Sequence, residues 1–277
     1  METSAMTRPG RFRARRAARG SMTEGAARAG LAARGVIYLL VGVLALRVAF
    51  GEGEEQADRS GALATIADKP FGAVLLWALG AGLVGMVLWR LSQAVFGSSG
   101  PDGRKPGKRF LAVVRCVFYV FGAWSVLSFA AGSGGGRSSD QQSRDLTARA
   151  LAVPAGQWFV GAVGAGIAVA GVWIGVRAAM RSYHDKLKLG ELSPRVRRLV
   201  DVTGVGGGVA RGLVFAVAGA FAVRAAVDYR PQKAKGLDDT LRSFADTPFG
   251  PWLLVLVAAG LVLFGLFSFA LARWRRV

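Results

Sequence analysis

Long runs of apolar residues alternate with charged segments along the whole chain. Three of these runs contain no charged residue: Phe71–Trp89, Trp158–Val176 and Phe249–Ala272. Each is at least as long as the roughly 18 residues that mark a membrane-spanning helix. The other three runs, of which Ala29–Phe50 is the first, are apolar apart from isolated arginines. The pattern therefore predicts an all-α integral membrane protein with six transmembrane helices.

Two short motifs recur three times along the chain. The first is an arginine followed four residues later by an aromatic residue, as in GLAARGVIY, LAVVRCVFY and GGVARGLVF. The second is a proline followed by a glycine at the second and twelfth positions after it, and by an aromatic residue at the nineteenth. From arginine to proline the spacing is 36, 39 and 37 residues. We therefore expect three tandem helical hairpins, 27–97, 108–187 and 203–277, in one membrane domain, 27–277.

The repeats also predict how the hairpins are oriented. Each copy crosses the membrane twice, so all three copies have the same orientation, and an axis along the membrane normal relates such parallel repeats. A pseudo-threefold ring is the simplest arrangement, and six helices packed with broken symmetry are the alternative. On the side of the termini 21 lysines and arginines flank the helices, against nine on the other side. This asymmetry predicts cytoplasmic N- and C-termini in a bacterial plasma membrane.

The polar segments outside the spanning helices have their own patterns. Residues 1–26 are rich in arginine and poor in large apolar residues, which predicts a disordered cytoplasmic tail. A short amphipathic segment precedes each repeat proline, and we expect these segments to be short helices on the outer membrane surface. Because the first helix of each hairpin has a short apolar stretch, we expect it to be central, and the uncharged second helix to face lipid.

Composition and charge narrow the class of function. The net charge is +19 and 52% of the residues are hydrophobic. The basic clusters flank spanning helices, so they fit membrane topology and argue against a nucleic-acid partner. The chain has one cysteine, Cys116, and one histidine, His184, which leaves no disulfide and no His/Cys metal cluster. No spanning segment holds paired carboxylates or a nucleophile beside a base, so we expect no catalytic residue, no cofactor and no enzyme activity.

The repeated arginines are the candidate site. They are Arg34, Arg115 and Arg211, and the tyrosines Tyr38 and Tyr119 follow the first two. As separate interfacial anchors, the arginines would each extend to a lipid phosphate. Alternatively, they converge on the inner face of the ring, where guanidinium groups bind phosphate or carboxylate. Membrane lipids with anionic headgroups are the expected partner, and for the convergent arrangement a solute anion is the alternative. A membrane-protein partner is also possible.

A second layer lies thirteen residues after each repeated arginine. Its members are Arg47, Ser128 and Arg224, so the layer is incomplete. Thirteen residues of helix separate the two layers by roughly 20 Å and rotate them by about 140°. One straight helix therefore cannot direct both arginines at the same partner, and we expect the second layer to anchor the outer interface.

Three copies of a two-helix unit with A-x-G-h-x-A-R-G-like and D-x-P-F-G-like motifs resemble the bacterial membrane family called domain of unknown function 1206. The resemblance covers about residues 27–277. The second copy departs from the pattern: Cys116 replaces the glycine after the arginine, and Val153–Pro154–Ala155 replaces K/T-P-F. The resemblance implies the three-hairpin topology and brings no known activity, cofactor or catalytic residue. The bias toward Ala, Arg and Gly resembles an actinobacterial proteome.

Two classes of function remain. The first is a structural, accessory or lipid-interacting protein of the cell envelope. The alternative is a small anion or solute transporter or channel, with a pathway on the pseudo-threefold axis. Transport pathways usually need polar groups near the membrane midplane, and those positions here are almost wholly Ala, Gly, Val, Leu and aromatic. The pattern therefore favours the first class.

Overall fold

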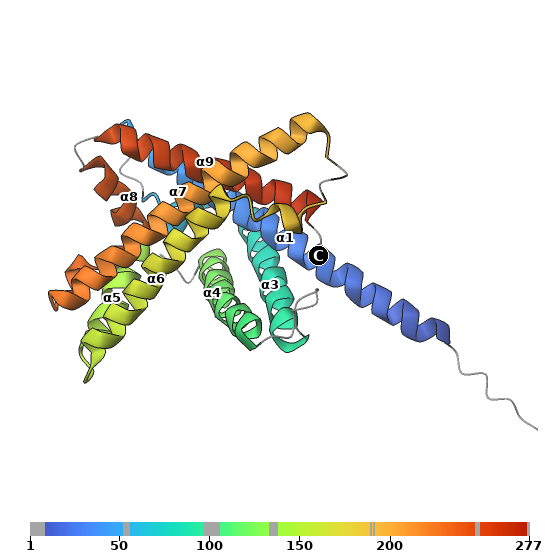
Figure 1. The fold of residues 1–277 in the computed structure, drawn as a ribbon, viewed down its shortest axis with the longest axis horizontal. Coiled ribbons are helices and arrows are strands. Elements are labelled where there is room, and N and C mark those ends of the chain that lie inside the picture. Colours follow the sequence, from blue (N-terminus) through green and yellow to red (C-terminus); the bar gives the residue numbers. More distant parts are fainter. Residues whose placement is uncertain are drawn as a thin grey trace, which may run out of the picture.

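The computed structural model describes residues 9–51, 56–96, 106–132, 138–188, 190, 192–246 and 250–275. Within these ranges the chain is helical, without named strands (Figure 1). Six helices are long and apolar enough to cross a membrane. They are α1 (Pro9–Ala49), α3 (Gly72–Phe96), α4 (Pro106–Ala130), α6 (Gly156–Ala179), α7 (Pro194–Val227) and α9 (Pro251–Trp274). This confirms the predicted fold class.

A short helix lies between the two spanning helices of each hairpin. These are α2 (Arg59–Ala67), α5 (Ser139–Leu151) and α8 (Leu237–Ala245). The three amphipathic segments expected to be helical are therefore helical. Two single 3-10 turns complete the described elements, η1 (His184–Lys186) after α6 and η3 (Pro231–Lys233) after α7.

The six spanning helices pack in a ring that joins each hairpin to the next. α3 packs on α4, α6 on α7, and α9 returns to pack on α1. Within hairpins, α1 packs on α3 and α7 packs on α9. No comparable packing joins α4 to α6 in the described residues, and the two helices stand apart in Figure 1. The ring is therefore open at one place, which we call the α4–α6 seam.

Glycines allow the closest of the contacts between hairpins. In the α6–α7 interface, a Cβ atom added to Gly171 would lie 2.3 Å from the backbone nitrogen of Ala216. A Cβ atom added to Gly212 would lie 2.6 Å from the nitrogen of Gly175. The two backbones therefore touch directly, in the small-residue packing typical of membrane helices.

The glycine twelve residues after each repeat proline faces the first helix of its own hairpin. A Cβ atom added to Gly82 of α3 would lie 3.1 Å from the carbonyl oxygen of Ala29 in α1. On Gly260 of α9 it would lie 2.2 Å from the Cβ atom of Ala210 in α7. The equivalent Gly166 of α6 has no atom within 4 Å of that position. The second hairpin thus keeps the glycine and lacks the contact.

The turn into each second spanning helix explains the glycine two residues after the proline. α3 and α6 begin at this glycine rather than at the proline. The residue between the two has a positive φ, 63° at Phe71 and 61° at Ala155. A Cβ atom added to Gly156 would lie 1.7 Å from the carbonyl oxygen of Ala150, so only glycine fits. The third proline, Pro248, lies outside the described residues.

The N-terminal segment differs from the prediction. α1 begins at Pro9 and continues without a break into the first spanning helix, and in Figure 1 it extends well beyond the other helices. Residues 9–26 are therefore helical, where the composition predicted disorder. Alanine and arginine are strong helix formers, and extending an existing helix avoids the unfavourable nucleation step. Residues 1–8 lie outside the described residues.

The expected placement of central and peripheral helices was wrong for α3 and α9. Among the apolar spans, α9 is the most buried, at 50%, and α3 equals α1 at 44%. α4 is only 22% buried, although it is the first helix of its hairpin. The reason is the α4–α6 seam, which leaves α4 packed mainly on α3, whereas α9 packs on both α1 and α7.

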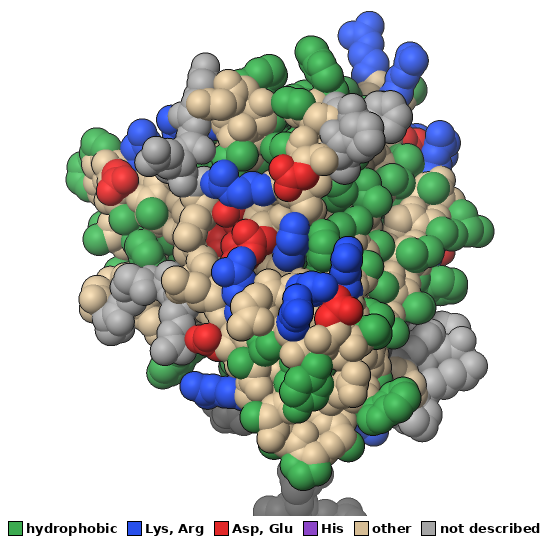
Figure 2. Space-filling model, turned by 90° about the vertical axis from the view of Figure 1, so that its left-hand side faces the viewer, with side chains coloured by type: hydrophobic (Ala, Val, Ile, Leu, Met, Phe, Trp, Pro, Cys, Tyr) green, Lys and Arg blue, Asp and Glu red, His purple; other side chains and the backbone are tan. Residues whose placement is uncertain are grey.

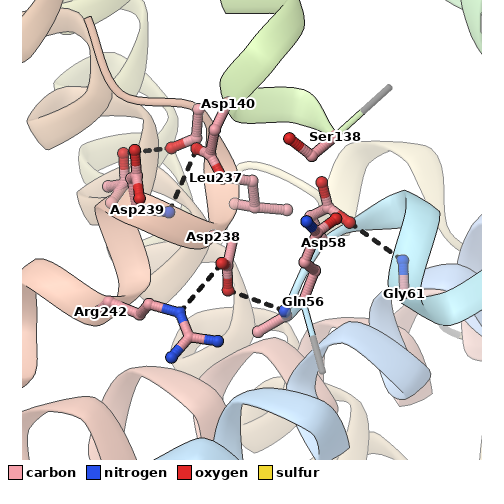
Figure 3. A network of polar contacts seen from close by, with 12 residues as sticks. Gln56, Asp58, Gly61, Ser138, Asp140, Leu237, Asp238, Asp239 and Arg242 are labelled. Carbon is pink, nitrogen blue, oxygen red and sulfur yellow. Dashed lines mark hydrogen bonds and ion pairs between the residues drawn. The ribbon is translucent and has the colours of Figure 1, made fainter. Parts of the chain in front are cut away.

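Three carboxylates link the short helices in a closed cycle, which we call the carboxylate cap (Figure 3). Each carboxylate accepts a hydrogen bond from a backbone N–H close to the start of the next short helix. Figure 2 views the end of the molecule where α5 and α8 lie, and charged side chains gather near its centre. The bonds of the cap are Asp58 Oδ2 to Ser139 N (2.8 Å), Asp140 Oδ1 to Asp239 N (3.2 Å) and Asp238 Oδ1 to Ala57 N (2.8 Å).

The carboxylates of the cap differ in their pKa. Burial raises the pKa of Asp58, but hydrogen bonds from Ser60, Ser139 and Gly61 together lower it below its ordinary value. Burial also raises the pKa of Asp140, and the charges of two neighbouring aspartates, Asp239 and Asp238, add to this and bring it to about 6. Asp58 therefore stabilises the cap as an anion, whereas Asp140 is held in a site that favours its protonated form.

Asp140 should make the fold more stable in mild acid. Its pKa of about 6 in the fold lies above the value of about 3.9 for an unfolded aspartate. The folded state then binds the extra proton, so the free energy of unfolding falls as the pH rises from about 4 to 6. We expect Asp140→Asn to reduce this loss, since the neutral amide still accepts the Asp239 hydrogen bond. Thermal unfolding of purified protein at pH 4.5 and pH 7 measures the effect.

The control for this prediction is Asp68→Asn, which removes an exposed carboxylate from the C-terminal end of α2. It should leave the difference in melting temperature between the two pH values as it is in the wild type. An Asp140→Asn variant with the wild-type difference would contradict the assignment.

Candidate functional site

The three repeated arginines lie on the first spanning helix of each hairpin, and the charges of all three act on one tyrosine. Tyr119 of α4 interacts electrostatically with Arg34 of α1 and with Arg211 of α7. Arg115, one turn before Tyr119, interacts with the same tyrosine and with Arg211. Arginines more than 75 residues apart in sequence thus interact electrostatically with one tyrosine.

Hydrogen bonds within the site join different hairpins. Arg211 donates from Nε to the Tyr38 hydroxyl at 2.9 Å, which links α7 to α1. Arg34 donates from Nε to Ser268 Oγ at 3.2 Å, which links α1 to α9. Arg34 also interacts electrostatically with Tyr119 and so reaches α4. The site therefore holds the three hairpins together as well as gathering charge.

Aromatic rings support the guanidinium groups. The guanidinium carbons of Arg34 and Arg211 lie 5.1 Å and 5.0 Å from the centre of the Phe264 ring. Tyr38 meets the same ring edge-on, with centroids 4.8 Å apart. Arg211 also lies 5.1 Å from the ring of Phe215, the aromatic residue that follows it in the repeat. Cation–π contacts of this kind favour a bound cation without neutralising it.

Two further arginines complete the site, and the sequence analysis missed both. Arg90, six residues before the end of α3, is 7% exposed, and Arg275 follows directly after α9. Their guanidinium carbons lie 4.3 Å and 4.7 Å from the Trp89 ring. Both Nε atoms are buried and have no hydrogen-bond partner. We call Arg34, Arg90, Arg115, Arg211 and Arg275 the arginine cluster.

Like charges act on one another within the cluster. Burial, followed by the charges of Arg90 and Arg34, lowers the pKa of Arg275 to about 10. The side chain nevertheless remains a cation at neutral pH. Arg90 Nη1 donates to Gln93 Oε1 at 2.8 Å, and Arg90 interacts electrostatically with Tyr119. The hydrogen-bond acceptors found for the cluster among the described residues are thus neutral groups.

No aspartate or glutamate forms an ion pair with the cluster in the described part of the chain. The ion pairs found there involve other cations, such as Arg28 with Glu24 and Arg242 with Asp238. Burying cations together without a counter-charge is unfavourable. Among the described residues, the cluster therefore gathers five cations, one of them buried, without an anionic partner.

A sequence signal for Arg90 exists in hindsight. It directly follows Trp89, the repeat aromatic residue of α3, and the equivalent residues are Ile174 in α6 and Ser268 in α9. Ser268 also lies in the site, since it accepts from Arg34. The position therefore faces the site in two hairpins, but the residue type changes, and a search for repeated residues does not reveal it.

The ring, the hairpins and the arginine cluster define an all-helical, multi-pass membrane protein built from three copies of one unit. The chain belongs to the family described as Domain of Unknown Function (DUF1206), whose model matches residues 29–97, 110–181 and 206–275. These segments correspond to the three hairpins and confirm the resemblance. The chain is similar to "Uncharacterized protein YxxB" of Bacillus subtilis (strain 168), with 34% identity over 246 residues covering 87% of each chain. No solved structure matches it.

Proposed function

We propose that this protein is a lipid-interacting component of the bacterial plasma membrane that holds an anionic group in the arginine cluster. The observation that carries the proposal is a group of five arginines from all three hairpins, four of which share the Phe264 and Trp89 rings in pairs, without an ion pair to any described carboxylate. Arginine binds phosphate and carboxylate through paired, charge-assisted hydrogen bonds. Phospholipid headgroups are the most abundant source of such groups around a membrane protein.

The position of the cluster supports this proposal over transport. Arg90 and Arg275 lie near the ends of α3 and α9, on the side of the two termini, which we infer to be cytoplasmic. Between the cluster and the carboxylate cap, the core is formed by buried apolar side chains, among them Val41, Leu44 and Val257. A path for a polar solute would need polar groups at that depth. The proposal therefore assigns a structural or accessory role rather than a channel.

The same proposal assigns no catalytic role, no metal and no cofactor to the cluster. Arginine side chains stay protonated and are poor general bases, so their chemistry here is binding. A further membrane protein remains a candidate partner, and the charge distribution around the spanning helices favours lipid over nucleic acid.

Arg90→Met tests this function through two effects of opposite sign. Without anionic lipid the variant should melt at a higher temperature than the wild type, because it loses a buried cation whose Nε has no partner. With added phosphatidylglycerol it should gain less stability than the wild type. Lipid at 100 times its Kd stabilises by about 2.7 kcal/mol. Thermal unfolding in a zwitterionic detergent, with and without the lipid, measures both effects.

Arg224→Met is the matched control, since it removes an arginine that is 69% exposed, at the other end of α7 from the cluster. It should keep the full response to phosphatidylglycerol. If the wild type does not respond to this lipid, or if Arg90→Met responds as strongly as the wild type, the proposed function is wrong.

A further inference from the structure

We propose that the ligand of the arginine cluster is a diacyl phospholipid that enters sideways through the α4–α6 seam. Its phosphate would lie on the cluster and its acyl chains would lie between α4 and α6. The inference rests on the proposed function and adds the class of ligand and its route. Four observations support it. They concern the missing packing at the seam, the exposed apolar side chains of α4 and α6, the cations at one end of these helices, and a second groove elsewhere that lacks such cations.

The seam is an interface that the other two hairpins form and the second hairpin leaves open. Gly82 and Gly260 bring α3 and α9 against the first helix of their own hairpins, whereas the equivalent Gly166 has open space within 4 Å. Because the three glycines are equivalent in the repeat, Gly166 marks the side of α6 where α4 would have packed. The space beside it is therefore available to another molecule.

The two helices that flank the seam present apolar side chains of the size that contacts lipid. The apolar spans of α4 and α6 are 22% and 17% buried, the lowest values among the six. Acyl chains cannot form hydrogen bonds with polar groups, so they pack favourably on apolar side chains such as these. The exposed large side chains of the two helices include Phe118, Phe121, Trp124, Phe159, Val169 and Trp173.

One end of the seam is cationic and includes Arg115, a member of the arginine cluster. Arg115 of α4 is exposed and interacts electrostatically with both Arg211 of α7 and Arg177 of α6. Arg177 lies in the last turn of α6, with its guanidinium carbon 5.9 Å from the Trp173 ring. Both flanking helices thus present a cation at the end of an apolar face. A phospholipid has the complementary shape and charge, with a phosphate at one end of two acyl chains.

A second apolar groove, between α1 and α3, lacks this charged end. Its volume is about 780 Å³, and it is lined by small and aliphatic residues, including Ala29, Ala78 and Gly82. No lysine or arginine lies among its lining residues. A lipid chain there would not place its phosphate on the cluster, so the observations favour the seam.

A photoreactive lipid tests the route. The full-length protein is placed in phosphatidylcholine nanodiscs with a trace of phosphatidylglycerol that carries a diazirine on one acyl chain. After illumination, labelled peptides are mapped by mass spectrometry. We expect labelling of α4 and α6 that excess unlabelled phosphatidylglycerol removes and excess phosphatidylcholine does not. Arg115→Gln should lower this specific labelling about tenfold, the effect of one charge-assisted hydrogen bond.

Two matched substitutions separate the seam from the rival groove. Gly166→Leu fills the seam beside α6, and the open space around Gly166 lets the fold accept it. Ala78→Leu makes a comparable change in the α1–α3 groove. We expect Gly166→Leu to reduce the specific labelling as strongly as Arg115→Gln does, and Ala78→Leu to leave it unchanged. An unchanged melting temperature shows that the Gly166 variant is folded.

The outcomes separate this inference from the function beneath it. Specific labelling that responds to Ala78→Leu and not to Gly166→Leu overturns the seam. If glycerol 3-phosphate displaces the label as well as phosphatidylglycerol does, a soluble anion occupies the cluster, and the seam inference fails while the anion site stands. If α4 and α6 stay unlabelled and chemical cross-linking joins two copies of the protein through these helices, a second copy covers the seam and the inference is wrong. If labelling ignores both lipids and Arg115→Gln, the cluster binds no anion and both proposals fail.

Discussion

Replacing Arg34, Arg115 and Arg211 together by glutamine is expected to weaken phosphatidylglycerol binding by at least roughly 100-fold. A hydrogen bond to a charged group contributes about 1.5–3 kcal/mol, and each 1.4 kcal/mol is a factor of ten. The three side chains share Tyr119 and interact with one another, so their contributions will not add, and two such bonds set the lower limit. Native mass spectrometry of the detergent-solubilised protein, titrated with the lipid, measures the change.

Two further variants show which property of the arginines matters. The double variant Arg47→Gln, Arg224→Gln, which we call the outer-end variant, changes arginines of α1 and α7 that lie thirteen residues beyond the cluster. It should leave lipid binding near the wild-type level. Lysine at all three repeat positions keeps the charge but loses the planar paired donors, so it should restore binding only in part. Equal losses in the outer-end variant and the triple glutamine variant would mean that general positive charge, and not the cluster, attracts the lipid.

Asp58→Ala should destabilise the fold by about 3 kcal/mol or more, the largest loss we expect from one substitution in the carboxylate cap. The Asp58 side chain is fully buried and accepts hydrogen bonds from the backbone of both Gly61 and Ser139. Alanine removes the N-cap of α2 and leaves both N–H groups without their acceptor. Chemical or thermal unfolding in detergent measures the loss.

The cap also predicts where the effect appears. Since Asp58 bonds to the first residue of α5, hydrogen exchange at the start of α5 should accelerate in the alanine variant. Asp68→Ala, at the other end of α2, changes an exposed carboxylate and should leave both stability and exchange nearly unchanged. A fully stable Asp58→Ala protein would mean that the cap does not hold the short helices together.

Most of the architecture could be predicted from sequence because its signals are local. The length of the apolar runs sets the spanning helices, and the repeated proline and glycine mark the turn into each second helix. Repetition also identified Arg34, Arg115, Arg211, Tyr38 and Tyr119, which the structure brings together. In these cases the same physical requirement recurs at the same position of each hairpin.

The carboxylate cap could not be predicted in this way. Its bonds run from side chain to backbone across 81 residues, between Asp58 and Ser139, and across 181 residues, between Ala57 and Asp238. The donors and acceptors also occupy different positions: Asp58 precedes the first residue of its helix, whereas Asp238 is the second residue of α8. The cycle is closed in space but does not repeat in sequence.

The α4–α6 seam has only a weak signal in the sequence, which is that the second copy of the repeat departs from the motifs of the other two. At the position after the arginine, Gly35 packs closely on α9 and Gly212 packs closely on α6, so both contact a different hairpin. Cys116 takes that position in α4 and still contacts α3, with its sulfur 3.7 Å from the Val87 carbonyl oxygen. The departure thus keeps the contact between hairpins, and Gly166 keeps the repeat glycine. The missing packing inside the hairpin follows from the arrangement of the whole ring.

Native mass spectrometry of the protein, extracted gently from its own membrane, tests the central claim most directly because it assumes no ligand. We expect an anionic phospholipid retained on the chain, and its loss when Arg34, Arg115 and Arg211 are replaced by glutamine. A bare protein, or a retained neutral lipid that is equally abundant on the triple variant, would contradict the account.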